Sequence, residues 1–213
     1  MPKRLFLSFV CLLFTANAPA TFANSPSQPN ILVMVSDDQS WMHTGANGDT
    51  EIKTPAFDQI AREGTRFIYP YTACPSCAPS RAAILTSQPI WQLGYGGVLF
   101  GALPADKPTY TDVLAKNGYE LGYVGKVWGP GSLYAGGYKE HPHGKSYRVT
   151  TPPQTPGISN VNYAASFEQF LSERDSQRPF CFYIAAFEPH RRFSYGAGQL
   201  SGKSLANAQL PGS

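Results

Sequence analysis

Three short apolar runs, each followed at once by charged or polar residues, constrain the fold of this chain most strongly. They span residues 30–36, 119–124 and 180–187. The first run is almost continuously apolar, a pattern typical of a strand that is buried on both faces and therefore of a parallel sheet. Segments with helical patterns occur at 54–64, 80–85, 109–118 and 163–174. Alternating strands and helices predict an α/β fold with a mainly parallel sheet sandwiched by helices.

The residues that follow these runs are the first candidate site residues. Asp37 and Asp38 follow the first run, Lys126 follows the second, and His190 follows the third. Ligands of open α/β sheets bind beyond the carboxyl ends of the strands. Two adjacent carboxylates repel each other unless a cation lies between them, and their oxygens suit a hard divalent ion. A lysine and a histidine at the same edge are suited to contacting an anion.

Each of these residues also has a simpler interpretation. Asp37 and Asp38 are equally compatible with a loop that caps the next element. Lys126 has the alternative of a solvated surface lysine, and His190 that of an ordinary exposed histidine. The local sequence leaves these alternatives open.

Residues 75–86 contain the second candidate site. Pro79 fixes its own φ and lacks an N–H, which suits the first turn of a helix over residues 80–85. Cys77 would then lie just before a helix N-terminus, where free N–H groups and the helix dipole favour an anion. Arg81 follows one helical turn later, so its guanidinium is expected near the cysteine. The pattern predicts a reactive side chain beside a fixed cation.

Cys77 also has alternative interpretations. Together with Cys74 it forms a C-x-x-C pair, which occurs in redox centres and in halves of zinc sites. The sequence contains no second C-x-x-C to complete a zinc site. A buried structural cysteine is the remaining alternative. Cys181, within the third apolar run, is expected to have such a packing role.

The remaining segments are expected to form the scaffold of the site. Residues 65–69 are expected to form a strand that leads to the cysteine. Thr109 is expected to cap a helix in which Val113 and Leu114 face the core. Residues 129–160 are rich in Gly, Pro, Tyr and His, and a long irregular segment of this kind favours a binding loop.

The N-terminus has the pattern of a secretory signal peptide. Lys3 and Arg4 precede a ten-residue apolar run at 5–14, and small residues follow it. Residues 1–23 are therefore expected to be cleaved, leaving 24–213 as an exported, periplasmic or secreted chain. The alternative is a membrane anchor, but the apolar run is too short to span a bilayer. The net charge of +3 includes no basic run, so nucleic acid is not an expected partner.

The cysteine segment resembles the signature of the sulfatase family, Cys-x-Pro-Ser-Arg followed by Leu-Thr-Gly. Residues 77–81 are Cys-Ala-Pro-Ser-Arg and residues 85–87 are Leu-Thr-Ser, so Ser87 replaces the usual glycine. This family depends on formylglycine and belongs to the alkaline phosphatase superfamily. The resemblance begins near Pro29 and covers nearly all of the mature chain. The earlier Asp-Asp pair and the later Gly-Lys and Pro-His pairs arrive in the family's order.

The resemblance implies a sulfuric ester hydrolase in which Cys77 is oxidised to formylglycine by a maturation enzyme. It assigns Asp37, Asp38 and the modified Cys77 to a metal, calcium or alternatively magnesium. It assigns Lys126 and His190 to the sulfate group of a sulfated small molecule or glycan, with Arg81 as a further catalytic cation. The nearest resemblance is to the branch containing heparan N-sulfatase and iduronate sulfatase.

The sequence departs from the family pattern in two places. Many members have a histidine shortly after the lysine, whereas Lys126 is followed by Val-Trp-Gly-Pro. His141 and His143 are the nearest histidines, and the sequence assigns neither to this position. After His190 there is no aspartate and only one lysine, Lys203, so the family's second pair of metal ligands is not apparent.

These departures suggest the N-terminal portion of a sulfatase domain and a poor or inactive enzyme. Two alternatives remain. One is a phosphatase or phosphonate hydrolase of the same superfamily, and the other is a non-catalytic truncated remnant that only binds.

Overall fold

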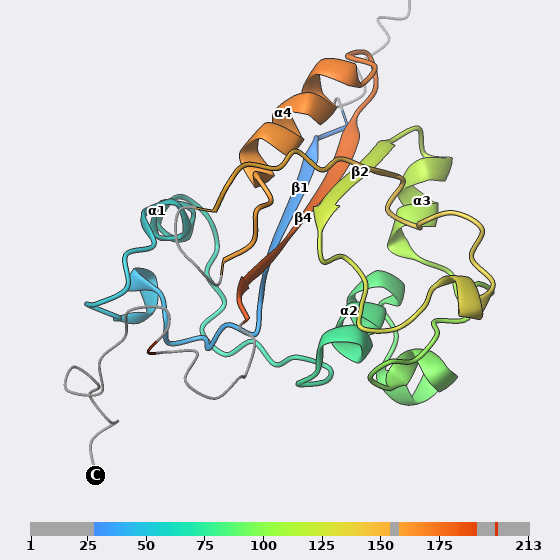
Figure 1. Ribbon diagram of the computed structural model, residues 1–213, viewed down its shortest axis with the longest axis horizontal. Coiled ribbons are helices and arrows are strands. Elements are labelled where there is room, and N and C mark those ends of the chain that lie inside the picture. The colour runs from blue at the N-terminus through green and yellow to red at the C-terminus, as the bar shows by residue number, and fades with distance from the viewer. Residues whose placement is uncertain (1–27, 154–157, 191–198, 200–213) are drawn as a thin grey trace, which may run out of the picture.

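A parallel four-stranded sheet forms the centre of the molecule (Figure 1). The computed structural model describes residues 28–153, 158–190 and 199. The spatial order of the strands is β1-β4-β2-β3, and every pair is parallel. The strands are β1 (Ile31–Asp37), β2 (Glu120–Gly125), β3 (Lys145–Ser146) and β4 (Phe180–Pro189). The three apolar runs therefore form the three long strands, and the predicted α/β class is confirmed.

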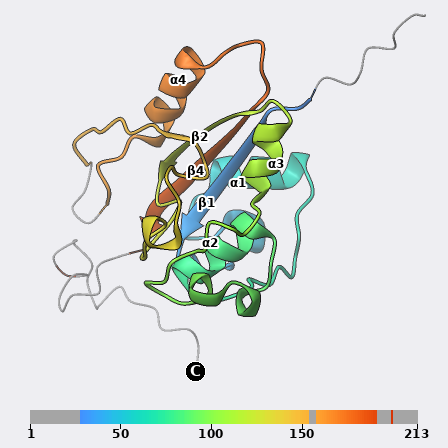
Figure 2. The same cartoon turned by 90° about the vertical axis from the view of Figure 1, so that its right-hand side faces the viewer.

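Helices cover both faces of the sheet. The described helices are α1 (Pro55–Glu63), α2 (Cys77–Thr86), α3 (Tyr110–Lys116) and α4 (Tyr163–Glu173), with short 3-10 helices at Gly45–Asn47, Ile90–Gln92, Gly94–Gly97 and Tyr134–Gly136. Neighbouring residues of a strand point to opposite faces. Phe182 of β4 packs in a cluster with Phe170 of α4, whereas Tyr183 packs with Tyr110 of α3. Figure 2 shows α4 and α3 on opposite sides of the strands.

The core beneath α4 is mostly aromatic. Phe170 and Phe182 are fully buried, with ring centroids 4.6 Å apart, and Phe180 meets Phe170 edge to face at 5.4 Å. Gly122 of β2 lies under these rings, and a Cβ atom at this position would come within 2.9 Å of Phe170. The close approach of α4 to the sheet therefore depends on a residue without a side chain.

Local capping signals place α3 and α4 as expected. Thr109 and Asp112 form a complete capping box at the start of α3. The Asn162 side chain accepts a hydrogen bond from the Ala165 N–H at the start of α4. Val113, however, is 57% exposed, so the expectation that it faces the core was wrong. Thr111 is the buried residue on the first turn of α3.

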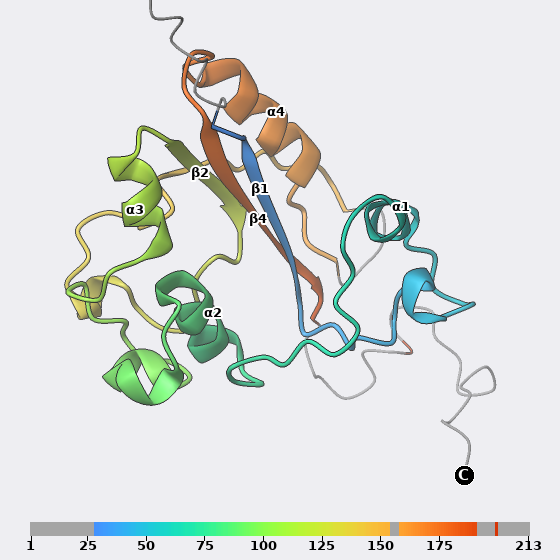
Figure 3. The ribbon, with the colours of Figure 1, turned by 180° about the vertical axis from the view of Figure 1, so that it is seen from behind.

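Other expectations about the scaffold were also wrong. The segment 65–69 is not a strand, and Phe67 and Tyr69 are largely exposed. β1 is an edge strand among the described residues, and it alternates between half-buried and exposed side chains instead of being buried on both faces. Leu32 and Met34 lie on its open side. Helix α1, which has no buried residue, lies apart beside this edge (Figure 3).

Candidate active site

The carboxyl ends of β1, β2 and β4 meet at one edge of the sheet. Asp37 is the last residue of β1 and, after an irregularity in the strand register, pairs with Pro189, directly before His190. Lys126 follows the last residue of β2, and its backbone N–H donates to the Ala185 carbonyl of β4. Parallel pairing thus places Asp37, Lys126 and His190 at the ligand-binding end of the sheet, as their positions in the sequence predicted.

Asp37 is the electrostatic centre of this edge. Its side chain is 5% exposed and forms salt bridges with two cations. The Arg81 Nη2 donates to Asp37 Oδ1 at 3.0 Å, and the Lys126 Nζ donates to Oδ2. A buried carboxylate is stable only when it is paired and hydrogen-bonded. One carboxylate between two cations leaves a local excess of positive charge, which suits an anionic ligand.

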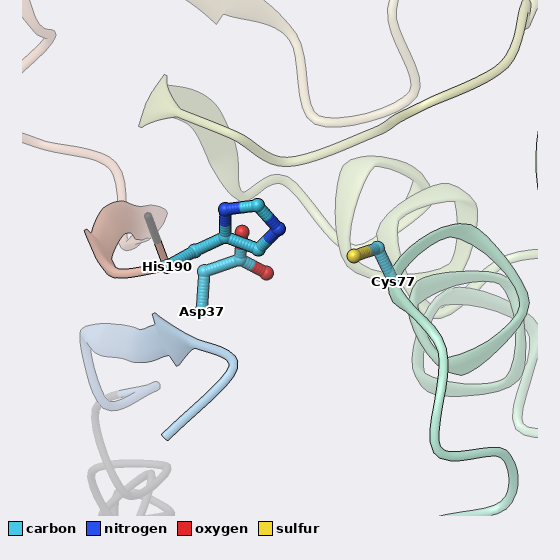
Figure 4. Close-up of side chains that lie close together, drawn as sticks. All are labelled: Asp37, Cys77 and His190. Atoms are coloured by element: carbon cyan, nitrogen blue, oxygen red, sulfur yellow. The ribbon is translucent and has the colours of Figure 1, made fainter. Parts of the chain in front are cut away.

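Cys77 faces this carboxylate from helix α2. Lys126 Nζ lies 3.4 Å from Cys77 Sγ, so one ammonium group contacts both the cysteine and Asp37. Ligand atoms of Asp37, Cys77 and His190 all lie within 4.8 Å of one another. Figure 4 shows the imidazole and the carboxylate directed toward the sulfur. With Arg81, which is hydrogen-bonded to Asp37, segments far apart in the sequence therefore bring five predicted site residues together.

The helix start differs in detail from the expectation. α2 begins at Cys77, with Ser76 as the N-cap in an extended conformation, so Pro79 is the third helical residue and not the first. Cys77 thus lies inside the first helical turn. Ser80 is the first residue whose N–H bonds to Ser76 O, and Pro79 has no N–H. The backbone N–H groups of Cys77 and Ala78 belong to the unpaired first turn, where the helix dipole favours negative charge.

Asp38 is the one predicted site residue that lies outside this group. It has a left-handed backbone (φ 59°) and an exposed side chain. Cys74 is a free thiol, as are Cys77 and Cys181, and it is not a member of the Asp37–Cys77–His190 group.

The donor atoms of this group bear on which metal it could hold. Asp37 contributes a carboxylate, Cys77 a thiol and His190 an imidazole. This donor set does not fit calcium, which takes six to eight oxygen ligands.

A buried histidine, His143, lies close enough to Arg81 to be affected by its charge, and the sequence alone did not assign it. His143 is 5% exposed, and its ring packs against Tyr183 of β4 and Tyr110 of α3. Burial lowers the pKa of His143 to about 3, with further lowering by His141 and Arg81. Among the described residues, both ring nitrogens are buried without a hydrogen-bond partner, as are Nε and Nη1 of Arg81. His143 is therefore a neutral core residue and not a member of the cysteine group.

The structure is thus an α/β protein in which a cysteine and three charged side chains meet at the carboxyl edge of a parallel sheet. The family model for sulfatases matches residues 29–204. The chain therefore belongs to the sulfatase family.

Curated relatives agree with this assignment. Human arylsulfatase D is 36% identical over 160 residues, which cover 68% of this chain and 26% of that protein. Human arylsulfatase A is 34% identical and aligns with 84% of this chain and 43% of its own length. The chain spans about a quarter of the length of the first relatives it matches (26%, 24% and 24%).

Solved structures show the same fold. One protein, solved in complex with its substrate D-glucosamine-2-N,6-O-disulfate, superposes with a TM-score of 0.59 at 25% identity, covering 78% of this chain and 35% of that one. A 2-O glycosaminoglycan sulfatase superposes with a TM-score of 0.59 at 26% identity, covering 76% of this chain and 35% of its own.

Proposed function

We propose that this chain carries the nucleophile half of a sulfuric ester hydrolase, with Cys77 converted to formylglycine. One observation carries the proposal. Cys77, Asp37, Lys126 and His190 come from three strand ends and a helix start and converge within hydrogen-bonding or ligand distance. Such a group, built on rigid elements and bearing excess positive charge, suits a tetrahedral anion with a nucleophile beside it.

We propose a distinct role for each side chain. The formylglycine hydrate at residue 77 would supply the hydroxyl that attacks sulfur, at the place now held by Sγ. Lys126, already 3.4 Å from that atom, would stabilise negative charge on the attacking group and on the sulfuryl oxygens. His190 lies opposite Cys77 (Figure 4). It would donate a proton or hydrogen bond to the leaving oxygen. The buried Arg81 would hold Asp37 in place and add positive charge.

A divalent metal is part of this proposal. After conversion, residue 77 offers oxygen in place of sulfur, and Asp37 and Asp38 add carboxylates at the end of β1. This oxygen set suits calcium, or alternatively magnesium, although it supplies fewer than the six to eight oxygens that calcium takes. When bound, such an ion would contribute charge stabilisation at the sulfuryl group. The remaining oxygens would have to come from outside these three residues.

The proposed substrate is a sulfated sugar. Two of the structural relatives described above are a protein bound to a disulfated glucosamine and a glycosaminoglycan sulfatase. Residues 129–160, which follow Lys126 along the chain, are proposed to help select the sugar.

The chain is further proposed to be exported to the periplasm or secreted, with residues 1–23 as its signal peptide and residues 24–213 as part of the catalytic domain. Residues 1–27 lie outside the described residues. No helix in the described part is long and apolar enough to cross a membrane. N-terminal sequencing of exported protein would locate the cleavage site.

The test combines mass spectrometry with turnover. The chain is produced with and without a formylglycine-generating enzyme, and the peptide containing Cys77 is fragmented to distinguish a thiol from an aldehyde. In a version extended to the full length of its relatives, aryl sulfate hydrolysis is expected only with the aldehyde, to be absent in Cys77→Ala, and to be retained in the matched control Cys74→Ala. Equal hydrolysis by Cys77→Ala would overturn the proposal. Faster turnover of the corresponding phosphate ester would identify a phosphatase instead.

A further inference from the structure

We infer that, while Cys77 remains a thiol, Asp37, Cys77 and His190 form a binding site for Zn²⁺ or a chemically similar borderline metal ion. The proposal concerns the unmodified protein and does not depend on sulfatase activity. It follows from the disagreement between the donor atoms that the structure brings together and the oxygen ligands that calcium needs.

The geometry of the three ligands is close to that of a metal site. The ligand atoms of the three side chains lie within 4.8 Å of one another, and they come from β1, α2 and the end of β4 (Figure 4). A tetrahedral zinc site has bonds of about 2.0–2.3 Å, which separates its ligand atoms by roughly 3.5 Å. Binding a metal would therefore require these ligand atoms to move closer together by about 1 Å. Three protein ligands leave the fourth position for water, as in open zinc sites.

The identity of the donors selects the metal. A thiolate is a soft ligand and an imidazole an intermediate one, and both favour zinc over calcium or magnesium. Zinc also binds a carboxylate oxygen at ordinary distances. Conversion of Cys77 to an aldehyde hydrate would replace the sulfur by oxygen and remove the soft ligand. The same site would then change its preference from a borderline metal toward a hard one.

Lys126 is expected to oppose metal binding. Its ammonium group contacts both Cys77 Sγ and Asp37, two of the three proposed ligands. A divalent cation must displace these contacts and overcome repulsion from a second positive charge. Lys126→Met keeps an unbranched side chain and removes the charge, so it is expected to strengthen zinc binding. A structural role for Lys126 would not predict this gain.

The experiment uses Co²⁺ as a spectroscopic probe on the full chain produced without a maturation enzyme, with the thiol verified by mass. A thiolate–cobalt charge-transfer band is expected in the wild-type protein and in Cys74→Ala, which removes the neighbouring free thiol. Zn²⁺ should displace the cobalt, and excess Ca²⁺ should not. Cys77→Ala is expected to lose the band. His190→Ala is expected to weaken Zn²⁺ binding by at least the roughly 10- to 100-fold seen for lost outer-shell partners.

Three results would overturn the inference. They are the absence of a band in wild-type protein, an undiminished band in Cys77→Ala, and displacement of cobalt by Ca²⁺ as readily as by Zn²⁺. Circular dichroism of each variant keeps the comparison among folded proteins. Because turnover is never measured, failure here leaves the proposed sulfatase function standing, and failure of that function leaves this site standing.

Discussion

Acidification should destabilise this protein through His143. Burial lowers the pKa of the imidazole to about 3 in the folded state, whereas an unfolded histidine titrates near 6.5. Between these values the unfolded chain binds the extra proton, so stability falls as pH decreases. This contribution is fully present above about pH 6.5 and is lost progressively toward pH 3. From pH 7 to pH 5 the loss is about 2 kcal/mol for this one group.

The surroundings of His143 explain why protonation is unfavourable. Its ring is enclosed by Tyr110 from α3, Tyr183 from β4 and Tyr123 from β2, with His141 on its own segment. The charged groups that act on it are Arg81 and, when protonated, His141, and both oppose a positive imidazole. No carboxylate is among the groups that shift its pKa.

Urea unfolding at pH 7 and pH 5 would measure this effect in the wild-type protein and in His143→Gln. The glutamine keeps a hydrogen-bonding side chain but cannot be protonated in this range. We expect the variant to lose about 2 kcal/mol less than the wild type between the two pH values. His141→Gln is a matched control for the neighbouring imidazole, whose pKa burial lowers to about 4. Equal losses in wild type and His143→Gln, or an NMR titration of folded His143 near pH 6.5, would refute the reasoning.

Three further predictions concern the scaffold, each measured as a change in the free energy of unfolding. Phe170→Ala empties the centre of the aromatic core and is expected to cost about 3–5 kcal/mol; a cost below that of an exposed Leu171→Ala would contradict this packing. Gly122→Ala places a methyl group 2.9 Å from Phe170 and is expected to cost about 1–3 kcal/mol. The control is Gly118→Ala, which has open space around it but a φ of 86° and therefore tests backbone strain alone. Asp112→Ala removes the capping box of α3 and is expected to cost about 1 kcal/mol, with the exposed Lys116→Ala as the control that should change little.

The sequence predicted the strand ends well because the signals there are local. An apolar run that stops at a charged residue determines both where a strand ends and which side chain reaches the ligand edge. Asp37, Lys126 and His190 were therefore predicted to lie at that edge before any pairing was known. The order β1-β4-β2-β3 was not predictable in this way, because it depends on which strands pair across long stretches of sequence.

The errors arose where tertiary contacts decide. Residues 65–69 have the composition of a strand, but no described strand pairs with them, and strand propensity has little meaning without a partner. The apolar run of β1 suggested burial on both faces, whereas Leu32 and Met34 are exposed on an edge strand. His143 lies in a Gly- and Pro-rich segment with no periodicity, so only the folded structure reveals its burial against Tyr110 and Tyr183.

The position of β4 in the sheet has a consequence for the order of events in folding. β4 lies between β1 and β2, yet it is the last of the described strands along the chain. The Phe180 N–H donates to the side chain of Asn30, 150 residues earlier. At the usual rate of synthesis, on the order of ten seconds pass between the appearance of these two segments. Until β4 inserts, β1 has no neighbour in this sheet, and Asp37 and His190 cannot meet Cys77. The proposed modification of Cys77, if it acts on an extended peptide, would have this interval in which to occur, and its length would be set by chain topology.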